Sequence, residues 1–344
     1  MKVIVTAGGT GGHIYPALSV VEKILENKDN EVLYIGTKNR MESKLVPEKG
    51  INYVGLEIYG LSKTNIKRNI KNVKCIISSY NKCKKIMKEF KPDYVIGFGG
   101  YVTFSVLMAA HKYKIRCAVH EQNKVPGKTN KILSKIVDET FVSFKESESS
   151  FSNKVIFSGN PCGEKAINSV KHDKTKLGLS KNKKLILIVM GSLGSESVNS
   201  KIKDFLLDFK SETYEILFIT GNSSYDKYKD LKVDKCVKII PYYNELSSLM
   251  KSTDLIISRA GASTISEILS LNLPSILVPS PYVANNHQYY NALDLKERKL
   301  AYLLEEKDLN KNNLNKAIEY VFKNEKEIIN NLKKEKKLKS STII

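Results

Sequence analysis

Short apolar runs of strand length alternate with helical patterns along nearly the whole chain of 344 residues. This alternation allows few folds, because a strand followed by a helix returns to the same sheet in parallel orientation. We predict strands at 2–7, 31–36, 52–56, 93–98, 116–121, 139–143 and 154–158, and then at 185–190, 215–220, 237–240, 255–258 and 275–278. The sequence therefore predicts an α/β fold of parallel sheets wound with crossover helices.

The alternation stops near Gly159-Asn160-Pro161 and starts again at Leu185. The polar stretch 165–184 is the best candidate for a linker. We therefore expect two Rossmann-like domains, residues 1–161 and 162–344, which face each other across a ligand-binding cleft. A charged helical tail, 310–338, follows the last strand, and the terminal helix can pack back on the N-terminal domain.

Composition excludes several classes of protein. A hydrophobic content of 42% suits a folded core and argues against disorder. No run approaches the roughly 18 to 20 apolar residues of a spanning helix, and we expect no secretory signal. The five cysteines are odd in number and form no CxxC pair, which indicates reduced thiols in a cytosol and no zinc site.

The net charge of +20 is concentrated in the segment 63–91, which holds ten basic residues against the single acid Glu89. Isoleucines and Tyr80 are interleaved with the lysines at helical spacing. Three interpretations stay open: a solvated helix with a core face, a contact with an anionic membrane, or nucleic-acid binding. The last is disfavoured, because no nucleic-acid-binding fold pattern is present.

Four glycine-rich turns each follow a predicted strand: AGGTGGH at 7–13, GFGGY at 97–101, GSLGS at 191–195 and RAGAST at 259–264. Such turns bind phosphates, since glycine admits close approach and the helix start offers free N–H groups. Their number suggests a diphosphate on each of two ligands. No Gly-Lys-Ser/Thr follows, and Ile14 stands where a dinucleotide fingerprint needs its third glycine, so a P-loop and an NAD site are disfavoured.

The stretch SRAGASTISE places Glu267 one helical turn after Thr264. Thr264 would meet a phosphate and Glu267 two ribose hydroxyls; alternatively both are capping residues. The chain contains no Asp-x-Asp pair to hold a divalent metal. We therefore expect no metal and no cofactor, with helix N-termini stabilising a departing diphosphate.

The motifs TAGGTGGHIYPA, GFGGYVTF, HEQN, GNP, SRAGASTISE and NNHQYYNA occur in the order seen in the MurG family, which the chain resembles over about residues 2–300. These enzymes are undecaprenyldiphospho-muramoylpentapeptide β-N-acetylglucosaminyltransferases. The resemblance implies a GT-B fold and inverting transfer of GlcNAc from UDP-GlcNAc to the C4 hydroxyl of MurNAc in lipid I. The product would be lipid II, a precursor of peptidoglycan, and the enzyme would therefore serve cell shape and cell division. The C-terminal domain would hold the donor, and the N-terminal domain the lipid-linked acceptor.

The resemblance also implies roles for single residues. Thr10, Gly11 and Gly12 would lie near the sugars and the acceptor diphosphate, Asn123 at the donor sugar, and Ser192 at the donor diphosphate or nucleoside. The donor would further be held by Gly261, Ala262, Ser263 and Thr264 at its phosphates, Glu267 at its ribose, Gln288 at its GlcNAc hydroxyls, and backbone groups around Ile240 to Tyr243 at its uracil.

One position departs from the family. After GNP the family often has an arginine at the diphosphate, whereas this chain has Cys162 and Gly163. Either another base, such as Arg259 or Lys165, covers that charge, or the contact is lost.

Inverting transfer needs a general base at the acceptor hydroxyl. His13 is the first candidate, although it could instead buttress the turn; His120 and Glu121 follow, with Glu121 equally suited to be an anchor. The basic segment would gain about 1 kcal/mol per cation at an anionic membrane. We thus expect a peripheral enzyme on the cytoplasmic side of the cell membrane that binds no nucleic acid.

Two alternatives remain at this stage. One is a different GT-B enzyme that glycosylates a diacylglycerol lipid, and the other is a non-catalytic protein that binds sugar nucleotides or nucleic acid. Transfer assays with each acceptor separate them.

Overall fold

The structure is a computed structural model that describes residues 1–60, 66–191 and 194–344, the side chains of 66–68 excepted. It divides the chain into two compact units. The first consists of Met1–Cys162 together with Leu338–Ile344, and the second of Gly163–Lys337. The division expected from the sequence placed the boundary one residue earlier.

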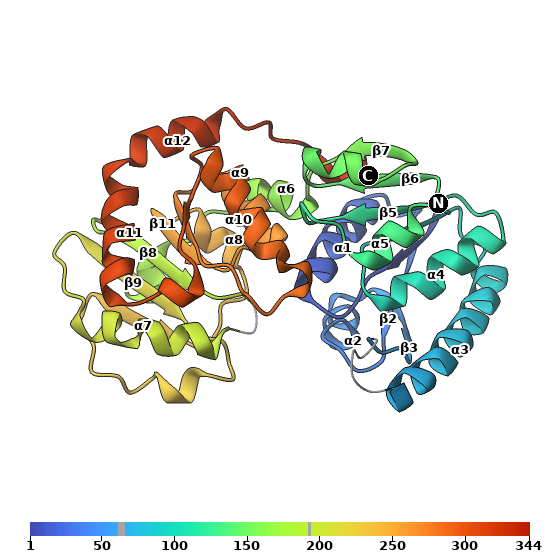
Figure 1. Cartoon of the computed structure of the whole chain (residues 1–344), viewed down its shortest axis with the longest axis horizontal. Helices are drawn as coiled ribbons and strands as arrows, with labels where there is room; N and C mark the ends of the chain where they lie inside the picture. The colour runs from blue at the N-terminus through green and yellow to red at the C-terminus, as the bar shows by residue number, and fades with distance from the viewer. Residues whose placement is uncertain (61–65, 192–193) are drawn as a thin grey trace. The chain divides into compact units, whose positions relative to one another are not determined.

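The described part of the first unit contains a seven-stranded parallel sheet in the order β3-β2-β1-β4-β5-β6-β7 (Figure 1). Helix α3 packs along α4, and α4 in turn lies on the sheet. The strands are β1 (Lys2–Thr6), β2 (Glu31–Thr37), β3 (Asn52–Leu56), β4 (Tyr94–Gly97), β5 (Cys117–Glu121), β6 (Glu139–Val142) and β7 (Lys154–Phe157). The helices are α1 (Gly11–Ile24), α2 (Glu42–Leu45), α3 (Ile66–Phe90), α4 (Tyr101–Lys112), α5 (Lys128–Leu133) and α13 (Ser340–Ile343), with 3-10 turns at Pro47–Lys49 and Lys145–Ser150.

The second unit repeats this plan with a six-stranded parallel sheet in the order β10-β9-β8-β11-β12-β13, among its described residues. The strands are β8 (Lys184–Val189), β9 (Tyr214–Ile219), β10 (Val237–Ile240), β11 (Leu255–Ser258), β12 (Ser275–Leu277) and β13 (Tyr302–Leu303). The helices are α7 (Glu196–Asp208), α8 (Leu246–Met250), α9 (Ala262–Leu271), α10 (His287–Glu297), α11 (Lys311–Lys323) and α12 (Glu325–Lys333), and α6 (Pro161–Asn168) begins at the unit boundary. The 3-10 turns are Lys174–Leu177, Tyr225–Lys227, Ala284–Asn286 and Glu306–Asp308.

Burial on both faces explains why the strands read as continuous apolar runs. In β8, the residues from Leu185 to Val189 are all buried. Every strand predicted from the sequence is present, to within a residue or two at its ends. Strand β13 was missed, because a pair of residues at a sheet edge carries no periodicity.

The stretch predicted to be a linker, 165–184, is not free. Its first residues continue α6, and Lys174–Leu177 forms a 3-10 turn. The His172 amide donates to the Ser248 carbonyl at 3.1 Å, so the segment is tied to the second unit. Polar composition made this stretch a candidate linker, but a backbone hydrogen bond to α8 holds it on the second unit.

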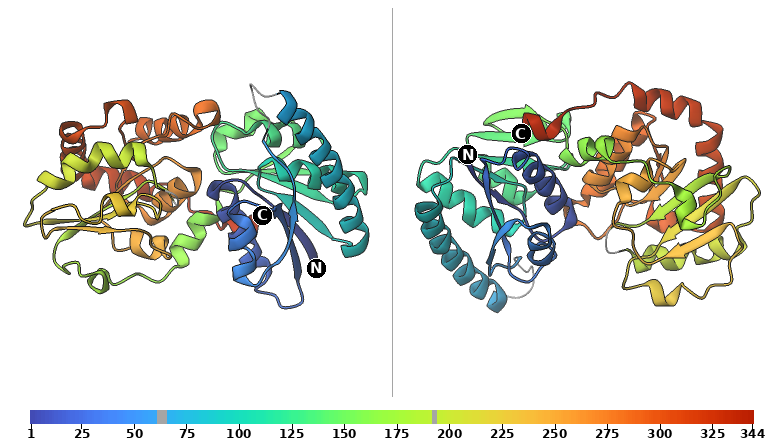
Figure 2. Two further views of the ribbon diagram at one scale, coloured as in Figure 1. Left: turned by 90° about the horizontal axis from the view of Figure 1, so that it is seen from below. Right: turned by 180° about the vertical axis from the view of Figure 1, so that it is seen from behind.

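The end of the chain returns to the first unit. Helix α13 packs beside α1, as the rear view of Figure 2 shows. A side chain at Gly159 would approach the Ser340 hydroxyl oxygen to 2.8 Å, so Gly159 allows this close contact at its φ of +73°.

In both sheets the carboxyl ends of two central strands form a topological switch point. Strands β1 and β4 are adjacent in the first sheet, and β8 and β11 in the second, while the chain proceeds outward on either side. Ligands of open parallel sheets bind at such points, outside the carboxyl ends of the strands. The four glycine-rich turns directly follow these four strands.

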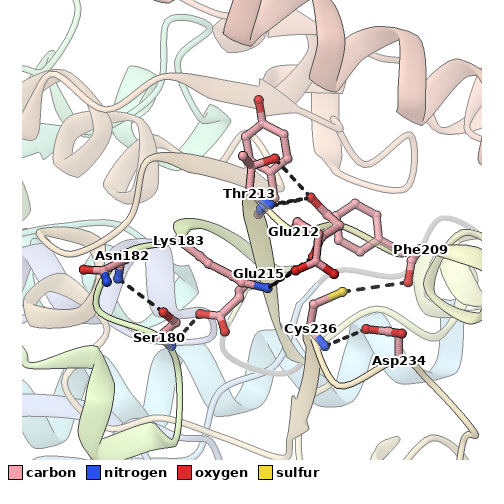
Figure 3. Close-up of polar contacts among 11 residues, drawn as sticks. Ser180, Asn182, Lys183, Phe209, Glu212, Thr213, Glu215, Asp234 and Cys236 are labelled. Carbon is pink, nitrogen blue, oxygen red and sulfur yellow. Dashed lines mark hydrogen bonds and ion pairs between the residues drawn. The ribbon is translucent and has the colours of Figure 1, made fainter.

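The opposite, amino edge of the second sheet is closed by polar contacts (Figure 3). The Glu215 carboxylate accepts a hydrogen bond from the Ser180 amide at 2.7 Å, and Asp234 accepts one from the Cys236 amide at 3.0 Å. These contacts satisfy loop amides at the edge away from the glycine turns, where we expect a structural role.

Candidate active site

The first glycine turn leads from β1 into α1. Gly9 adopts a φ of +92°, which glycine tolerates without strain. The Thr10 carbonyl accepts from the amides of His13 at 3.1 Å and Ile14 at 3.2 Å. Within the described ranges, no hydrogen bond occupies the amides of Thr10, Gly11 and Gly12. These three N–H groups therefore offer the anion site expected at a helix start.

His13 lies against both glycine turns of the first unit. Its Nδ1 is 3.2 Å from the Gly8 carbonyl oxygen and 3.5 Å from the Thr10 hydroxyl. A carbonyl can only accept, so Nδ1 carries the proton in the neutral ring and Nε2 keeps its lone pair. The arrangement thus buttresses the turn and also leaves a basic nitrogen, and it combines the two roles that the sequence had set against each other.

The second glycine turn touches the first. The Gly8 amide donates to the Gly99 carbonyl at 3.3 Å. A side chain at Gly100 would lie 2.4 Å from the Gly8 carbonyl oxygen, and one at Gly99 would lie 3.0 Å from the His13 ring. Both residues have positive φ angles. Glycine is needed here because the two turns and the imidazole pack at backbone distance.

The HEQN segment follows β5 and is largely internal. His120 is fully buried and bonds through Nε2 to the Gly159 carbonyl at 3.0 Å. Burial lowers the pKa of His120 to about 4, which makes this imidazole a poor proton acceptor at neutral pH. Gln122 donates to the Phe98 carbonyl at 2.7 Å and joins the segment to the second turn.

Glu121 is also buried, and both of its carboxylate oxygens are occupied. One accepts from the Asn123 amide at 2.9 Å and from the Asn123 side chain at 3.2 Å. The other accepts from the Gly127 amide and the Asn130 side chain, both at 2.9 Å. These four contacts favour the anchor role over the base role, and Glu121 acts on Asn123 by fixing its backbone.

The third glycine turn follows β8. Ser192 lies outside the described residues. A side chain at Gly194 would lie 2.1 Å from the Thr220 carbonyl oxygen, so the turn packs directly on the chain that leaves β9. Asn199 on α7 donates to the same carbonyl at 2.9 Å.

Arg259 is buried and bonded within the second unit. Its guanidinium donates to the Ser195 hydroxyl at 2.8 Å and to the Val278 carbonyl at 3.2 Å. It also pairs with the carboxylate of Glu306, likewise buried, at 2.6 Å. The positive charge of Arg259 is therefore compensated inside the unit, and the residue connects the third turn to the 3-10 turn at Glu306–Asp308.

The fourth glycine turn begins α9. Gly261 is the N-cap, and its carbonyl accepts from the Ile265 amide at 2.9 Å. The Ser263 hydroxyl oxygen is buried and has no partner in the structure. Since a buried hydroxyl is normally paired, this atom is available to a ligand at the helix start.

Glu267 lies one turn further along α9. It accepts a hydrogen bond from the Ser247 hydroxyl at 2.5 Å. Burial raises the pKa of Glu267 to about 7, although the Ser247 bond and the charge of Lys165 oppose this shift. A carboxyl that titrates near neutrality beside a glycine-rich turn at a switch point is typical of a functional site. Ser247 was not found from the sequence, because nothing in its neighbourhood marks it.

Two further candidate donor contacts lie in α10 and at the end of β10. The Gln288 carbonyl oxygen accepts from the Ser280 amide at 2.9 Å, which orients the side chain. The Ile240 carbonyl accepts from the Thr220 amide at 3.1 Å. Near Ile240, the Tyr243 hydroxyl is 2.7 Å from Nδ1 of His172.

The basic segment of the first unit, 63–91, is described from residue 66 onward, where it forms α3. Ile70, Val73 and Ile77 expose 57%, 49% and 56% of their surface, and their spacing places them on one face. Lys71 and Lys74 are exposed between them. None of the described helices is both long and apolar enough to span a membrane.

Two parallel α/β units, with glycine turns at both switch points and a titratable carboxyl beside one of them, have the architecture of the GT-B class. The predicted fold class is confirmed by a crystal structure of Acinetobacter baumannii MurG, which matches with a TM-score of 0.78 at 25% identity and covers 99% of this chain and 97% of that chain. A Staphylococcus aureus MnaA–UDP structure, at 16% identity and a TM-score of 0.68, shares the fold alone.

Family models give the same result from the sequence. The N-terminal domain of glycosyltransferase family 28 matches residues 3–142, and its C-terminal domain matches residues 185–344. The chain belongs to glycosyltransferase family 28. It is a UDP-GlcNAc-dependent glycosyltransferase, as the resemblance implied.

Curated relatives carry one name, UDP-N-acetylglucosamine–N-acetylmuramyl-(pentapeptide) pyrophosphoryl-undecaprenol N-acetylglucosamine transferase. The protein of Caldanaerobacter subterraneus subsp. tengcongensis is 41% identical across 99% of this chain and 96% of its own length. That of Bacillus subtilis is 40% identical across 94% and 92%. The resemblance to the MurG family is thereby confirmed.

Proposed function

We propose that the chain transfers GlcNAc from UDP-GlcNAc to the C4 hydroxyl of MurNAc in lipid I, with inversion, and so makes lipid II for peptidoglycan. The name shared by relatives that match nearly its full length carries this proposal. The diacylglycerol-glycosylating alternative lacks such support.

The second unit binds the donor in this proposal. The α9 start, with the Gly261 and Ala262 backbone and the hydroxyls of Ser263 and Thr264, holds the UDP diphosphate by amide and hydroxyl donors. Glu267 accepts hydrogen bonds from the ribose, and Gln288 bonds the GlcNAc hydroxyls through its amide group. Ser192 and the backbone at Ile240 complete the donor contacts predicted from the resemblance.

Arg259 supports this site from within. Because its guanidinium already bonds Ser195 and Glu306, we assign it to holding the third turn rather than to the diphosphate. We assign the charge that the family's arginine would cover to Lys165, the other base considered from the sequence. Its charge acts on Glu267, which indicates that it lies close to the donor site.

The first unit binds the acceptor. The amides of Thr10, Gly11 and Gly12 receive its diphosphate, and Asn123, fixed by Glu121, contacts the transferred sugar. His13 takes the proton from the C4 hydroxyl on Nε2 as that oxygen attacks the anomeric carbon, while the bond from this carbon to the diphosphate breaks and UDP leaves. The Nδ1–H group donates to the Gly8 carbonyl, and this bond holds the ring in the tautomer that the step requires.

We further propose that the enzyme associates peripherally with the cytoplasmic face of the cell membrane through α3. Its exposed isoleucine and valine face would insert among lipid headgroups, while the lysines attract anionic lipid. Neither a metal nor a nucleic acid takes part in the proposal.

The test is transfer of labelled GlcNAc from UDP-GlcNAc to a short-chain lipid I, with and without EDTA, beside a diacylglycerol acceptor. Product from lipid I alone, undiminished by EDTA, supports the proposal. Product from diacylglycerol alone would replace it, and loss of turnover with EDTA would refute metal independence.

A further inference from the structure

A buried carboxylate that no motif identified lies under the first glycine turn. Glu42, the first residue of α2, has no exposed surface. Its Oε1 accepts from the Thr37 hydroxyl at 2.7 Å, from the Thr37 amide at 3.1 Å and from the Gly9 amide at 3.3 Å. Oε2 lies 3.4 Å from the same Gly9 nitrogen. No ion pair joins this carboxylate to any cation among the described residues.

The chain makes room for this carboxylate with two glycines. A side chain at Gly8 would lie 2.5 Å from Oε1 of Glu42, and one at Gly36 would lie 2.8 Å from its Cγ. The site is thus built by three separate segments: the turn after β1, the end of β2 and the start of α2. Burial of an unpaired charge is costly, so its hydrogen-bonded placement here needs a reason.

The hydrogen bonds of the turn supply one. The Gly9 amide points inward to Glu42, whereas the next three amides, of Thr10, Gly11 and Gly12, have no hydrogen-bond partner among the residues that the structure describes. The carboxylate therefore fixes Gly9, the residue after which the amides of the turn no longer bond to the interior. The same turn carries the Gly8 carbonyl that bonds His13.

We propose that Glu42 is a positioning residue for the acceptor half of the reaction: by holding Gly9 it orients the open amides of the first turn and the His13 ring. This inference rests on the proposed function of that turn. It assigns Glu42 no contact with substrate.

The chain offers a matched control. Glu139 is also a buried carboxylate of the first sheet, but it begins β6 and so lies at the opposite, amino edge. It bonds Lys154 at 2.6 Å and Arg116 at 3.1 Å. Glu139→Ala removes a comparable buried group from the same sheet without touching the turn.

The experiment measures transfer to short-chain lipid I, with separate constants for acceptor and donor, for Glu42→Ala, Glu42→Gln, Thr37→Val and Glu139→Ala. We expect Glu42→Ala to lower kcat/KM for the acceptor about 100-fold and to leave the donor KM unchanged, because misplacing a turn by about 1 Å costs that much. Glu42→Gln keeps the Oε1 acceptor and should recover to within about tenfold of wild type. Glu139→Ala should retain the wild-type acceptor kcat/KM and donor KM, although it should lower Tm about as much as Glu42→Ala does.

Hydrogen exchange of the Gly9 amide provides a readout that does not need activity. Exchange should quicken in Glu42→Ala and Thr37→Val but not in Glu139→Ala. Should Glu42→Ala fail to fold, Thr37→Val, which removes only the 2.7 Å bond, carries both measurements.

The inference is overturned if Glu42→Ala and Thr37→Val keep the acceptor kcat/KM of Glu139→Ala, or if their donor KM rises as the acceptor kcat/KM falls. It is also overturned if exchange of the Gly9 amide is unchanged in these two variants. If wild type transfers nothing to lipid I, the proposed function fails, while the exchange data still decide whether Glu42 holds the turn.

Discussion

The pH dependence of donor binding tests the assignment of Glu267 to the ribose. A carboxylate accepts two hydroxyl hydrogen bonds, whereas a protonated carboxyl must give up one acceptor position. Burial raises the pKa of Glu267 to about 7, so this group changes its state within the physiological range. Donor affinity should therefore increase as the pH rises.

The size of the effect follows from the pKa. With a pKa of about 7, roughly one-tenth of the molecules are ionised at pH 6 and nine-tenths at pH 8. Because apparent affinity scales with the competent fraction, the dissociation constant for UDP-GlcNAc should fall about tenfold over this interval. Near pH 6.5, binding should release about 0.8 proton, since most free enzyme is then protonated at this site.

Titration calorimetry with UDP-GlcNAc alone measures both quantities, using buffers of different ionisation enthalpy. Omission of the acceptor keeps the proton transfer assigned to His13 out of the signal. Glu267→Gln should abolish the pH dependence and the proton release. Ser247→Ala removes a hydrogen bond that favours the charged form, so it should move the midpoint above that of wild type.

The reasoning fails if wild-type affinity is flat from pH 6 to 8, or if Glu267→Gln keeps the wild-type slope. The stability of the free enzyme gives an independent check with a fixed sign. The folded-state pKa of Glu267 lies above the ordinary value of a glutamate, so its contribution to stability is present at low pH and declines as the pH rises through 7. Glu267→Gln should accordingly raise Tm at pH 8 more than at pH 5.

Three other outcomes are expected. His13→Ala should lower kcat by a factor of about 10² to 10⁴ and leave UDP-GlcNAc affinity intact in calorimetry; an unchanged kcat would remove His13 as the base. Arg259→Met leaves the carboxylate of Glu306 buried without its partner and should cost about 3 to 5 kcal/mol in urea unfolding, much of which Glu306→Gln in the same chain should restore; no recovery would contradict the ion-pair account. Ile70→Glu with Ile77→Glu should weaken sedimentation with anionic vesicles beyond the effect of salt while turnover of a water-soluble acceptor persists, and vesicle binding equal to wild type would exclude α3 as the contact.

Much of the candidate site could be proposed from the sequence, because its residues follow strands directly. The glycines within 8–12, 99–100 and 191–194 indicate turns in the sequence. The strand that precedes each turn determines at which edge of the sheet the turn lies. Residues whose role depends on a distant partner gave no such signal. Arg259 resembles a diphosphate ligand in sequence, but its partner Glu306 comes 47 positions later, as the two numbers show.

The sequence by itself determined the two parallel sheets and the places of the four glycine turns, because apolar periodicity and glycine spacing are local properties. Its motifs carried the resemblance to the MurG family. Only the tertiary structure decided that His120 is buried and neutral, that Glu121 and Arg259 bond internally, and that Glu42 lies beneath Gly9. Those properties depend on burial and on hydrogen-bond partners from other segments, and neither exists until the strands have assembled.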